Sequence, residues 1–77
     1  MLKKIDKTLV AAYAYEDYRI EILEMDGEYE AWLQHKDYGV KDLMFGAMKE
    51  QTSLDEFVTA VENELDKYIE TYEESYY

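Results

Sequence analysis

The sequence predicts an α+β domain: a three-stranded antiparallel meander over residues 18–48, packed against a long C-terminal amphipathic helix over residues 53–74. The meander is indicated by apolar residues that alternate along the middle of the chain and by two turn signals between them. The helix is indicated by apolar residues at helical spacing in the last third. An N-terminal helix or extra strand over residues 2–15 completes the fold, and residues 75–77 form a tail. A length of 77 residues fits one domain, residues 1–77.

Residues 2–15 fit two structures. Leu2, Ile5 and Leu9 recur at helical spacing, and the alanines that follow favour a helix. From Leu9 to Tyr15 the apolar residues also alternate, as they do in a strand. We favour the helix over residues 2–12, with extended chain after it, and keep the strand as the alternative.

The first strand of the meander is predicted from Tyr18 to Met25. Its alternation slips by one place at Leu23, which indicates a bulge or a strand that is covered on both faces. Asp26-Gly27 follows and predicts a two-residue hairpin, because both central positions of a type I′ turn need a positive φ. The returning strand is predicted from Glu28 to His35.

A second turn is predicted at Lys36-Asp37-Tyr38-Gly39, with Gly39 as the residue of positive φ. The third strand runs from Val40 to about Met48 and is apolar on both sides. Gly46 inside it indicates a bulge or a close approach of another backbone segment.

The C-terminal helix begins with a capping signal. Ser53 followed by Glu56 forms a capping box, and Thr52 followed by Asp55 is a competing register. The apolar residues behind the cap lie within an arc of about 120°, which suits a helix on one face of a sheet. They are Leu54, Phe57, Val58, Val61, Leu65, Tyr68, Ile69 and Tyr72.

The composition predicts a folded domain held together by its apolar core. Hydrophobic residues make up 48% of the chain, which has no cysteine for a disulfide or a thiolate metal site. No apolar run approaches the roughly 18 residues that a membrane span needs. The basic N-terminal residues precede no apolar stretch long enough for a signal peptide, so we expect a cytoplasmic location.

Enzymatic and metal-binding signatures are not found. His35 is the one histidine, and it is predicted to be structural. Ser53 and Ser75 lie at a helix cap and in the tail, outside any nucleophile motif. The acids around Asp26-Gly27 lack the spacing of a calcium loop. We expect no catalytic residue, no cofactor and no metal.

The net charge of −11 determines which partners the chain favours. It opposes nucleic acid and anionic membranes, and it favours basic protein surfaces. Residues 1–49 hold ten acids and seven bases, whereas residues 50–77 hold nine acids and one base, Lys67. Most of the negative charge therefore belongs to the C-terminal helix.

One side of that helix gathers the acids into a stripe, here named the acidic flank: Asp55, Glu62, Asp66, Glu70 and Glu73. The flank covers an arc of about 80° and a length of about 27 Å. Its carboxylates are more widely spaced than DNA phosphates, which follow one another every ~3.4 Å along a strand. A nucleic-acid mimic would need sheet acids or a second copy to complete it. A merely solvated helix face is the alternative, although neighbouring like charges on the flank repel one another.

Aromatic residues supply a second, weaker candidate for partner binding. Trp32 is expected on the sheet face opposite Tyr29, Ala31 and Leu33, while Tyr76 and Tyr77 follow the helix. Aromatic rings beside carboxylates suit the recognition of arginine-rich surfaces. The alternative is that Trp32 anchors a small second core with Leu2, Ile5 and Leu9.

The Asp26-Gly27 hairpin, the meander to Met48 and the acidic segment Asp55–Glu74 together resemble small anti-CRISPR and related anti-defence proteins of phages and mobile elements. The resemblance implies an inhibitor that places carboxylates where its target would bind DNA or RNA.

The predicted function is therefore a non-enzymatic, acidic protein-binding module, in one form a nucleic-acid-mimicking inhibitor of a basic nucleic-acid-binding protein or nuclease. The alternative is a small homodimeric accessory protein that uses the aromatic sheet face around Trp32.

Overall fold

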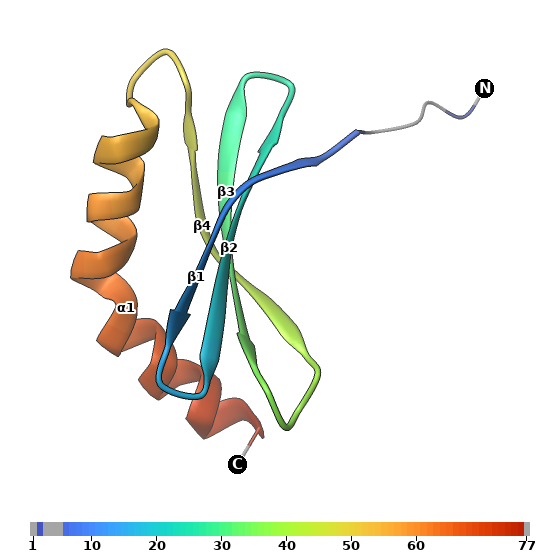
Figure 1. Cartoon of the computed structure of the whole chain (residues 1–77), viewed down its shortest axis with the longest axis vertical. Helices are drawn as coiled ribbons and strands as arrows, with labels where there is room; N and C mark the ends of the chain where they lie inside the picture. The colour runs from blue at the N-terminus through green and yellow to red at the C-terminus, as the bar shows by residue number, and fades with distance from the viewer. Residues whose placement is uncertain (1, 3–5, 77) are drawn as a thin grey trace.

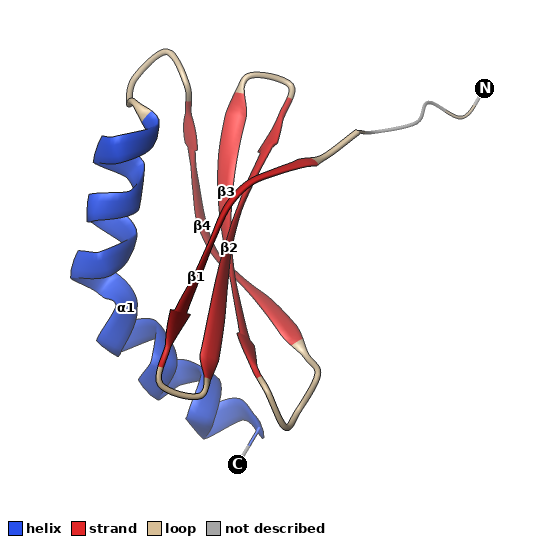
Figure 2. Cartoon of the chain, viewed as in Figure 1, coloured by secondary structure: helices blue, strands red, loops and turns tan. Residues whose placement is uncertain are grey.

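A computed structural model describes residue 2 and residues 6–76. It has two layers, a four-stranded antiparallel sheet and one long helix on a single face of it (Figures 1 and 2). The strands follow one another in the sheet in chain order. The elements are β1 (Thr8–Tyr15), β2 (Tyr18–Met25), β3 (Glu28–His35), β4 (Lys41–Met48) and α1 (Leu54–Tyr76). The three predicted strands and the C-terminal helix are confirmed, but the meander has four strands where three were predicted.

The two predicted turns are also confirmed. Asp26 and Gly27 both have positive φ, 43° and 79°, and they join β2 to β3 with the residues of each strand directly opposite. Gly39 has a φ of 67° in the turn before β4. The third predicted strand begins at Lys41, one residue later than expected.

The favoured N-terminal helix is wrong where the structure describes it. From Thr8 onward the chain is the strand β1, which pairs with β2 along its length, so the meander has four strands. Within the predicted helix, residues 3–5 lie outside the described residues. The alanines have only a weak preference for a helix. The backbone hydrogen bonds that β1 forms with β2 outweigh it.

The slip in the alternation of β2 coincides with an irregularity in its neighbour. β2 and β3 pair without interruption, whereas the register of β1 shifts between Leu9 and Ala11, so that Val10 is the extra residue. Leu9 lies opposite Leu23, which is partly buried on the face turned away from α1. The predicted bulge therefore belongs to β1 and not to β2.

A second register shift lies in β4 and brings Met44 into the core. Trp32 pairs with Leu43 and Ala31 with Phe45, which makes Met44 the extra residue. Gly46 is not the bulge but a close approach, because a Cβ there would lie 3.0 Å from the backbone oxygen of Tyr29.

The capping box at the start of α1 is confirmed. The Ser53 hydroxyl accepts from the backbone N–H of Glu56, and the Glu56 carboxylate accepts from the backbone N–H of Ser53, both at 3.2 Å. The helix continues to Tyr76, so residues 75 and 76 are helical and the predicted tail is wrong there. Tyr77 lies outside the described residues.

The core lies between α1 and the sheet face formed by alternate residues of the central strands. Its fully buried side chains come from both layers, and the largest are Tyr72, Phe57, Ile20, Ile22 and Leu33. Tyr72 also ties α1 to the sheet, since its hydroxyl accepts from the His35 backbone N–H and donates to the Val40 carbonyl oxygen. No helix in the described part of the chain is long and apolar enough to span a membrane.

Candidate functional site

The acidic flank lies on the side of α1 that faces β1. Glu73 accepts a hydrogen bond of 3.0 Å from the hydroxyl of Tyr18, at the start of β2 beside the end of β1. Glu62 and Asp66 line a groove that β1 borders. Asp55, Glu62, Asp66 and Glu70 are exposed, and no ion pair within the described residues involves a member of the flank. The exposed carboxylates of the flank therefore carry negative charge that no cation of the described residues offsets.

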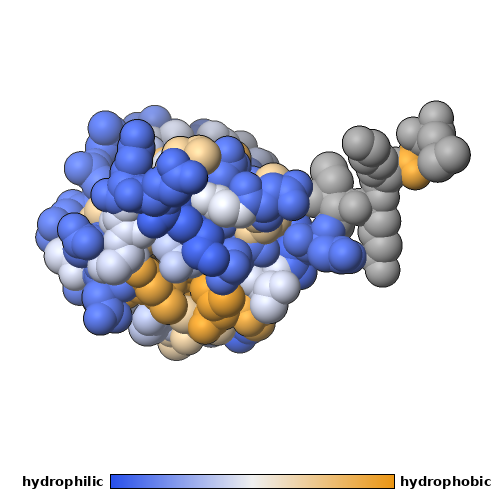
Figure 3. Space-filling model, turned by 90° about the horizontal axis from the view of Figure 1, so that it is seen from above, coloured by the Kyte–Doolittle hydropathy of each residue, from blue (hydrophilic) through white to orange (hydrophobic). Residues whose placement is uncertain are grey.

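The groove exists because α1 packs mainly over β3 and β4 and leaves the β1 side of the sheet uncovered. It has a volume of about 390 Å³. Its apolar floor comes from β2 and the core-facing side of α1, and Tyr13 and Tyr15 form the β1 wall with 45% and 40% of their surfaces exposed. Hydrophobic side chains gather along one side of the molecule in Figure 3, amid a mostly hydrophilic surface.

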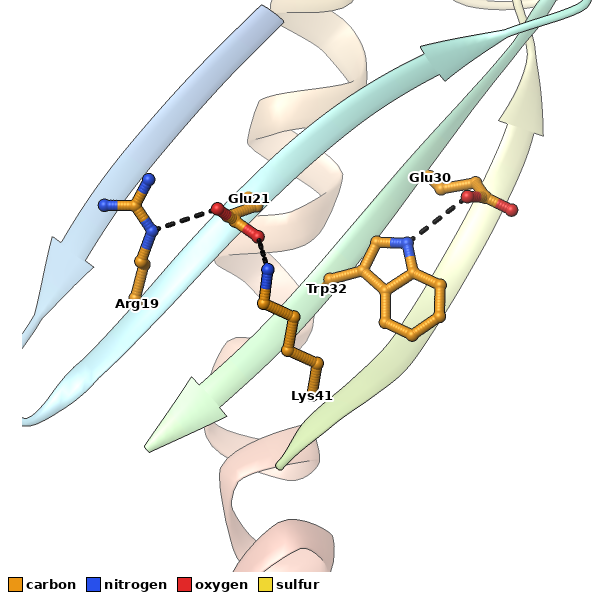
Figure 4. A network of polar contacts seen from close by, with 5 residues as sticks. All are labelled: Arg19, Glu21, Glu30, Trp32 and Lys41. Carbon is orange, nitrogen blue, oxygen red and sulfur yellow. Dashed lines mark hydrogen bonds and ion pairs between the residues drawn. The ribbon is translucent and has the colours of Figure 1, made fainter. Parts of the chain in front are cut away.

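The carboxylates of the sheet behave differently from those of the helix. Glu21 accepts from the Lys41 ammonium at 2.6 Å and from the Arg19 guanidinium at 3.1 Å, on the face turned away from α1 (Figure 4). The hydrogen bond from Lys41 lowers the pKa of Glu21 most, with a further contribution from Arg19 that partial burial opposes. The negative charge of this carboxylate is therefore offset by two cations of the same chain.

Three other sheet acids also have partners within the chain, two of them cations and one a tyrosine hydroxyl. Glu30 pairs with Lys7 at 3.1 Å, Glu24 pairs with Lys49, and Asp42 accepts a hydrogen bond from the Tyr76 hydroxyl. Glu21 and Glu30 lie on the opposite sheet face from α1, so they cannot extend the acidic flank (Figure 4). The flank is thus a single helical stripe, and sheet acids do not complete it.

Trp32 lies half-buried on the open face of the sheet. Its indole N–H donates to Glu30 at 3.3 Å, and the Lys7 ammonium lies 5.3 Å from the ring centroid. Leu2 is 99% exposed and Leu9 is 48% exposed, so neither builds the predicted second core around Trp32. Ile5, the third predicted member, lies outside the described residues.

Tyr76 is used inside the fold. Its ring centroid lies 4.7 Å from that of Tyr72, and its hydroxyl donates to Asp42 at 2.7 Å. This hydrogen bond raises the pKa of Tyr76, with smaller contributions from loss of hydration and from the negative charge of Asp42. Tyr77, the other aromatic candidate at this end, falls among the residues that are not described.

His35 is buried and held on several sides. Its Nδ1 accepts from the Asp37 backbone N–H at 3.1 Å, and its ring packs edge-on against Tyr18 at a centroid distance of 4.9 Å. Within the described residues, no three side chains of histidine, aspartate or glutamate come together as metal ligands.

Sequence reasoning found the acidic flank but missed the groove beside it. The available signal was the segment from Thr8 to Tyr15, eight residues without a charge in a strongly charged chain. No protein-family model matches the chain, and no curated protein or solved structure shows significant similarity to it.

Proposed function

We propose that this protein is a non-enzymatic binding module that presents the acidic flank of α1 to a basic surface on another protein. The observation that carries the proposal is the division of charge. The sheet acids Glu21, Glu24 and Glu30 pair with lysines and an arginine of the same chain, whereas the flank carboxylates have no such partners in the described residues. Cations from outside are the natural complement of the flank.

The spacing of the flank decides which part of a basic site it would engage. Its five acids extend over about 27 Å, or one carboxylate every ~5–7 Å, at a helical rise of 1.5 Å per residue. A DNA strand carries phosphates about every 3.4 Å. The flank therefore engages separate lysine or arginine side chains of a site, such as the nucleic-acid site of a nuclease, and does not reproduce a whole duplex. The resemblance to anti-defence proteins implies that binding of this kind inhibits the target.

Capture of basic proteins at increasing salt tests the proposal. Immobilised protein should retain basic nucleic-acid-binding proteins at low salt and lose them steeply as salt rises, because screening weakens exposed charge pairs. Reversal of Glu62, Asp66 and Glu70 to lysine should abolish retention. Exposed residues outside the flank provide a matched control, in which Asp37, Glu50 and Glu64 are reversed to lysine. Both variants change the net charge from −11 to −5, since each reversal adds two.

The comparison of the two variants separates a site from bulk charge. Loss of capture in the flank variant alone supports the proposal. Equal loss in both variants would show that net charge suffices, and retained capture in the flank variant would exclude the flank as the binding surface. Circular dichroism must show that both variants keep the fold.

The alternative of a homodimer through the Trp32 face has less support. Lys7 lies over the indole ring, and the paired side chains of Arg19, Glu21 and Lys41 occupy the same sheet face. Charged residues are depleted at the centres of protein interfaces. Sedimentation of the protein and of the Trp32→Ala variant checks this alternative.

A further inference from the structure

The two edges of the sheet differ in how they are protected against further strand pairing. β4 carries the charges of Lys41 and Asp42 and a bulge at Met44, features by which edge strands resist pairing. β1 carries no charge from Thr8 to Tyr15, and its one register shift, at Val10, lies near its beginning. From Ala11 to Tyr15 its pairing with β2 is regular. β1 is therefore the edge that is open to another strand.

The backbone of this regular stretch supplies the donors and acceptors for such a strand. In an antiparallel ladder, alternate residues exchange hydrogen bonds with the neighbouring strand, and those between them direct their N–H and C=O groups outward. Tyr15 and Tyr18 flank the two-residue turn and form a bonded pair. Bonded and outward-directed residues alternate from Tyr15 back along β1. Ala12 and Ala14 therefore direct their backbone N–H and C=O groups away from β2.

The groove lies directly beside this edge. Side chains of an added strand alternate between the two sheet faces, so every second one would point toward α1. There the strand would meet the apolar groove of about 390 Å³ and the carboxylates of Glu62 and Asp66 on its helical wall. The exposed side chains of Tyr13 and Tyr15 would pack against those side chains of the added strand that point toward α1.

We propose that β1 accepts a basic, extended segment of the partner protein as a fifth, antiparallel or parallel strand. Groove-facing apolar side chains of that segment cover the floor, and groove-facing lysine or arginine side chains reach Glu62 and Asp66. This inference rests on the proposed function and adds the way in which the partner binds, namely strand addition with side-chain pockets for specificity.

Charge identifies the occupant as a basic segment and not a second copy of the chain. The groove wall holds two carboxylates, and the whole chain carries −11. A second copy joined through β1 would bring an equal negative charge and an uncharged strand that leaves Glu62 and Asp66 unpaired. A cationic strand neutralises them.

Hydrogen exchange of the unaltered protein with synthetic peptides tests the proposal directly. The probe is a capped eight-residue peptide, matched in length to β1, that repeats two arginines followed by two valines, so that each face of the strand carries both residue types. In one control peptide proline replaces valine, which keeps the charge but removes backbone donors. In the other, glutamate replaces arginine. We expect the arginine–valine peptide to slow exchange at the Ala12 and Ala14 amides at least tenfold, with no change along β4 and no effect of either control.

An edge variant supplies the second measurement. Ala12→Pro removes an outward N–H from an exposed position, so the fold should survive while strand addition is blocked. We expect at least a tenfold weaker affinity for the arginine–valine peptide. Ala14→Pro repeats the test one outward residue later, in case one of the substitutions prevents folding.

The outcomes distinguish this inference from the proposed function. Equal protection by the arginine–proline peptide, or unchanged peptide affinity in folded proline variants, would overturn strand addition. Capture of basic proteins that depends on the flank would then still support the proposed function. A dimer that forms through β1 and excludes the peptide would also overturn the inference. Loss of both capture and peptide binding in the flank variant, with loss of peptide binding and weaker capture in the edge variants, would support both.

Discussion

At the residue scale, Tyr72 contributes most to joining the two layers. Its side chain is 1% exposed, and its ring packs edge-on against Tyr18 at a centroid distance of 5.7 Å. Its hydroxyl accepts from the His35 N–H at 3.2 Å and donates to the Val40 carbonyl at 2.6 Å. One phenol therefore supplies both core volume and hydrogen bonds to the end of β3 and the turn beyond it.

Substitution of Tyr72 by phenylalanine should destabilise the fold without emptying the core. The ring stays, but a buried N–H and a carbonyl oxygen lose their partner, which costs about 1–3 kcal/mol. We expect the melting temperature to fall by about 4–8 °C per kcal/mol for a domain of this size. Thermal unfolding followed by circular dichroism measures the change. Tyr68→Phe is the control, because the Tyr68 hydroxyl makes no hydrogen bond within the described residues, and an equal loss in both variants would contradict the assignment.

The sequence predicted some residue conformations and not others for a simple reason. Asp26-Gly27 and Gly39 belong to residue types that favour positive φ, and all three adopt it. Glu16, in the turn between β1 and β2, also has a positive φ of 53°, although glutamate gives no such signal. There the two paired strands impose the turn on residues that do not prefer it.

At the element scale, α1 was predictable because its signals are local. The cap at Ser53, the apolar spacing and the uniform charge all lie within the helix itself, and the structure confirms the helix. Its last two residues were missed because Tyr76 is held there by Asp42, a contact across 34 positions that no local pattern reveals.

The cap provides a test of how α1 begins. Ser53→Ala removes the hydroxyl that accepts from the Glu56 N–H, and we expect a loss of about 1 kcal/mol in the free energy of unfolding. Thr52→Ala is the matched control, because the Thr52 hydroxyl donates to the Ser53 carbonyl oxygen and caps no helical N–H among the described contacts. Urea unfolding compares the two. A larger effect at Thr52 would indicate that the helix begins one residue earlier in solution.

β1 was the element on which the favoured helix prediction was wrong and the strand alternative was right, and its bulge explains why the helix was favoured. The extra residue Val10 moves Leu9 to the open face while Ala11, Tyr13 and Tyr15 stay on the α1 face. Alternation is broken at that point, and three alanines remain as a misleading helical signal. The groove was missed for the same reason, since it forms only when β1 is recognised as the edge next to the acidic flank.

At the scale of the whole molecule, negative charge protects an edge that is otherwise open to pairing. β1 is uncharged and exposes Leu9, Tyr13 and Tyr15, a combination that favours association between sheets. The net charge of −11 opposes that association by repulsion between molecules. Solubility therefore depends on charges that lie mostly on α1.

Removal of that charge by acid should lead to association through β1. Near the isoelectric point of about 4.3 the repulsion vanishes, and we expect light scattering to rise within the time of an ordinary titration. Ala12→Pro should delay the rise, because it removes an outward backbone donor without changing the charge. Unchanged scattering in the folded variant would indicate that molecules associate through another surface.

The order of the elements along the chain has a consequence for how the domain acquires its structure. Every strand pairs with its neighbour in sequence, so the sheet can form from short loops, which favours rapid folding. The residues that cover it, from Leu54 to Tyr76, come after all four strands. During synthesis the hairpins therefore emerge first, and their apolar face stays exposed to chaperones or to other nascent chains until α1 leaves the ribosome.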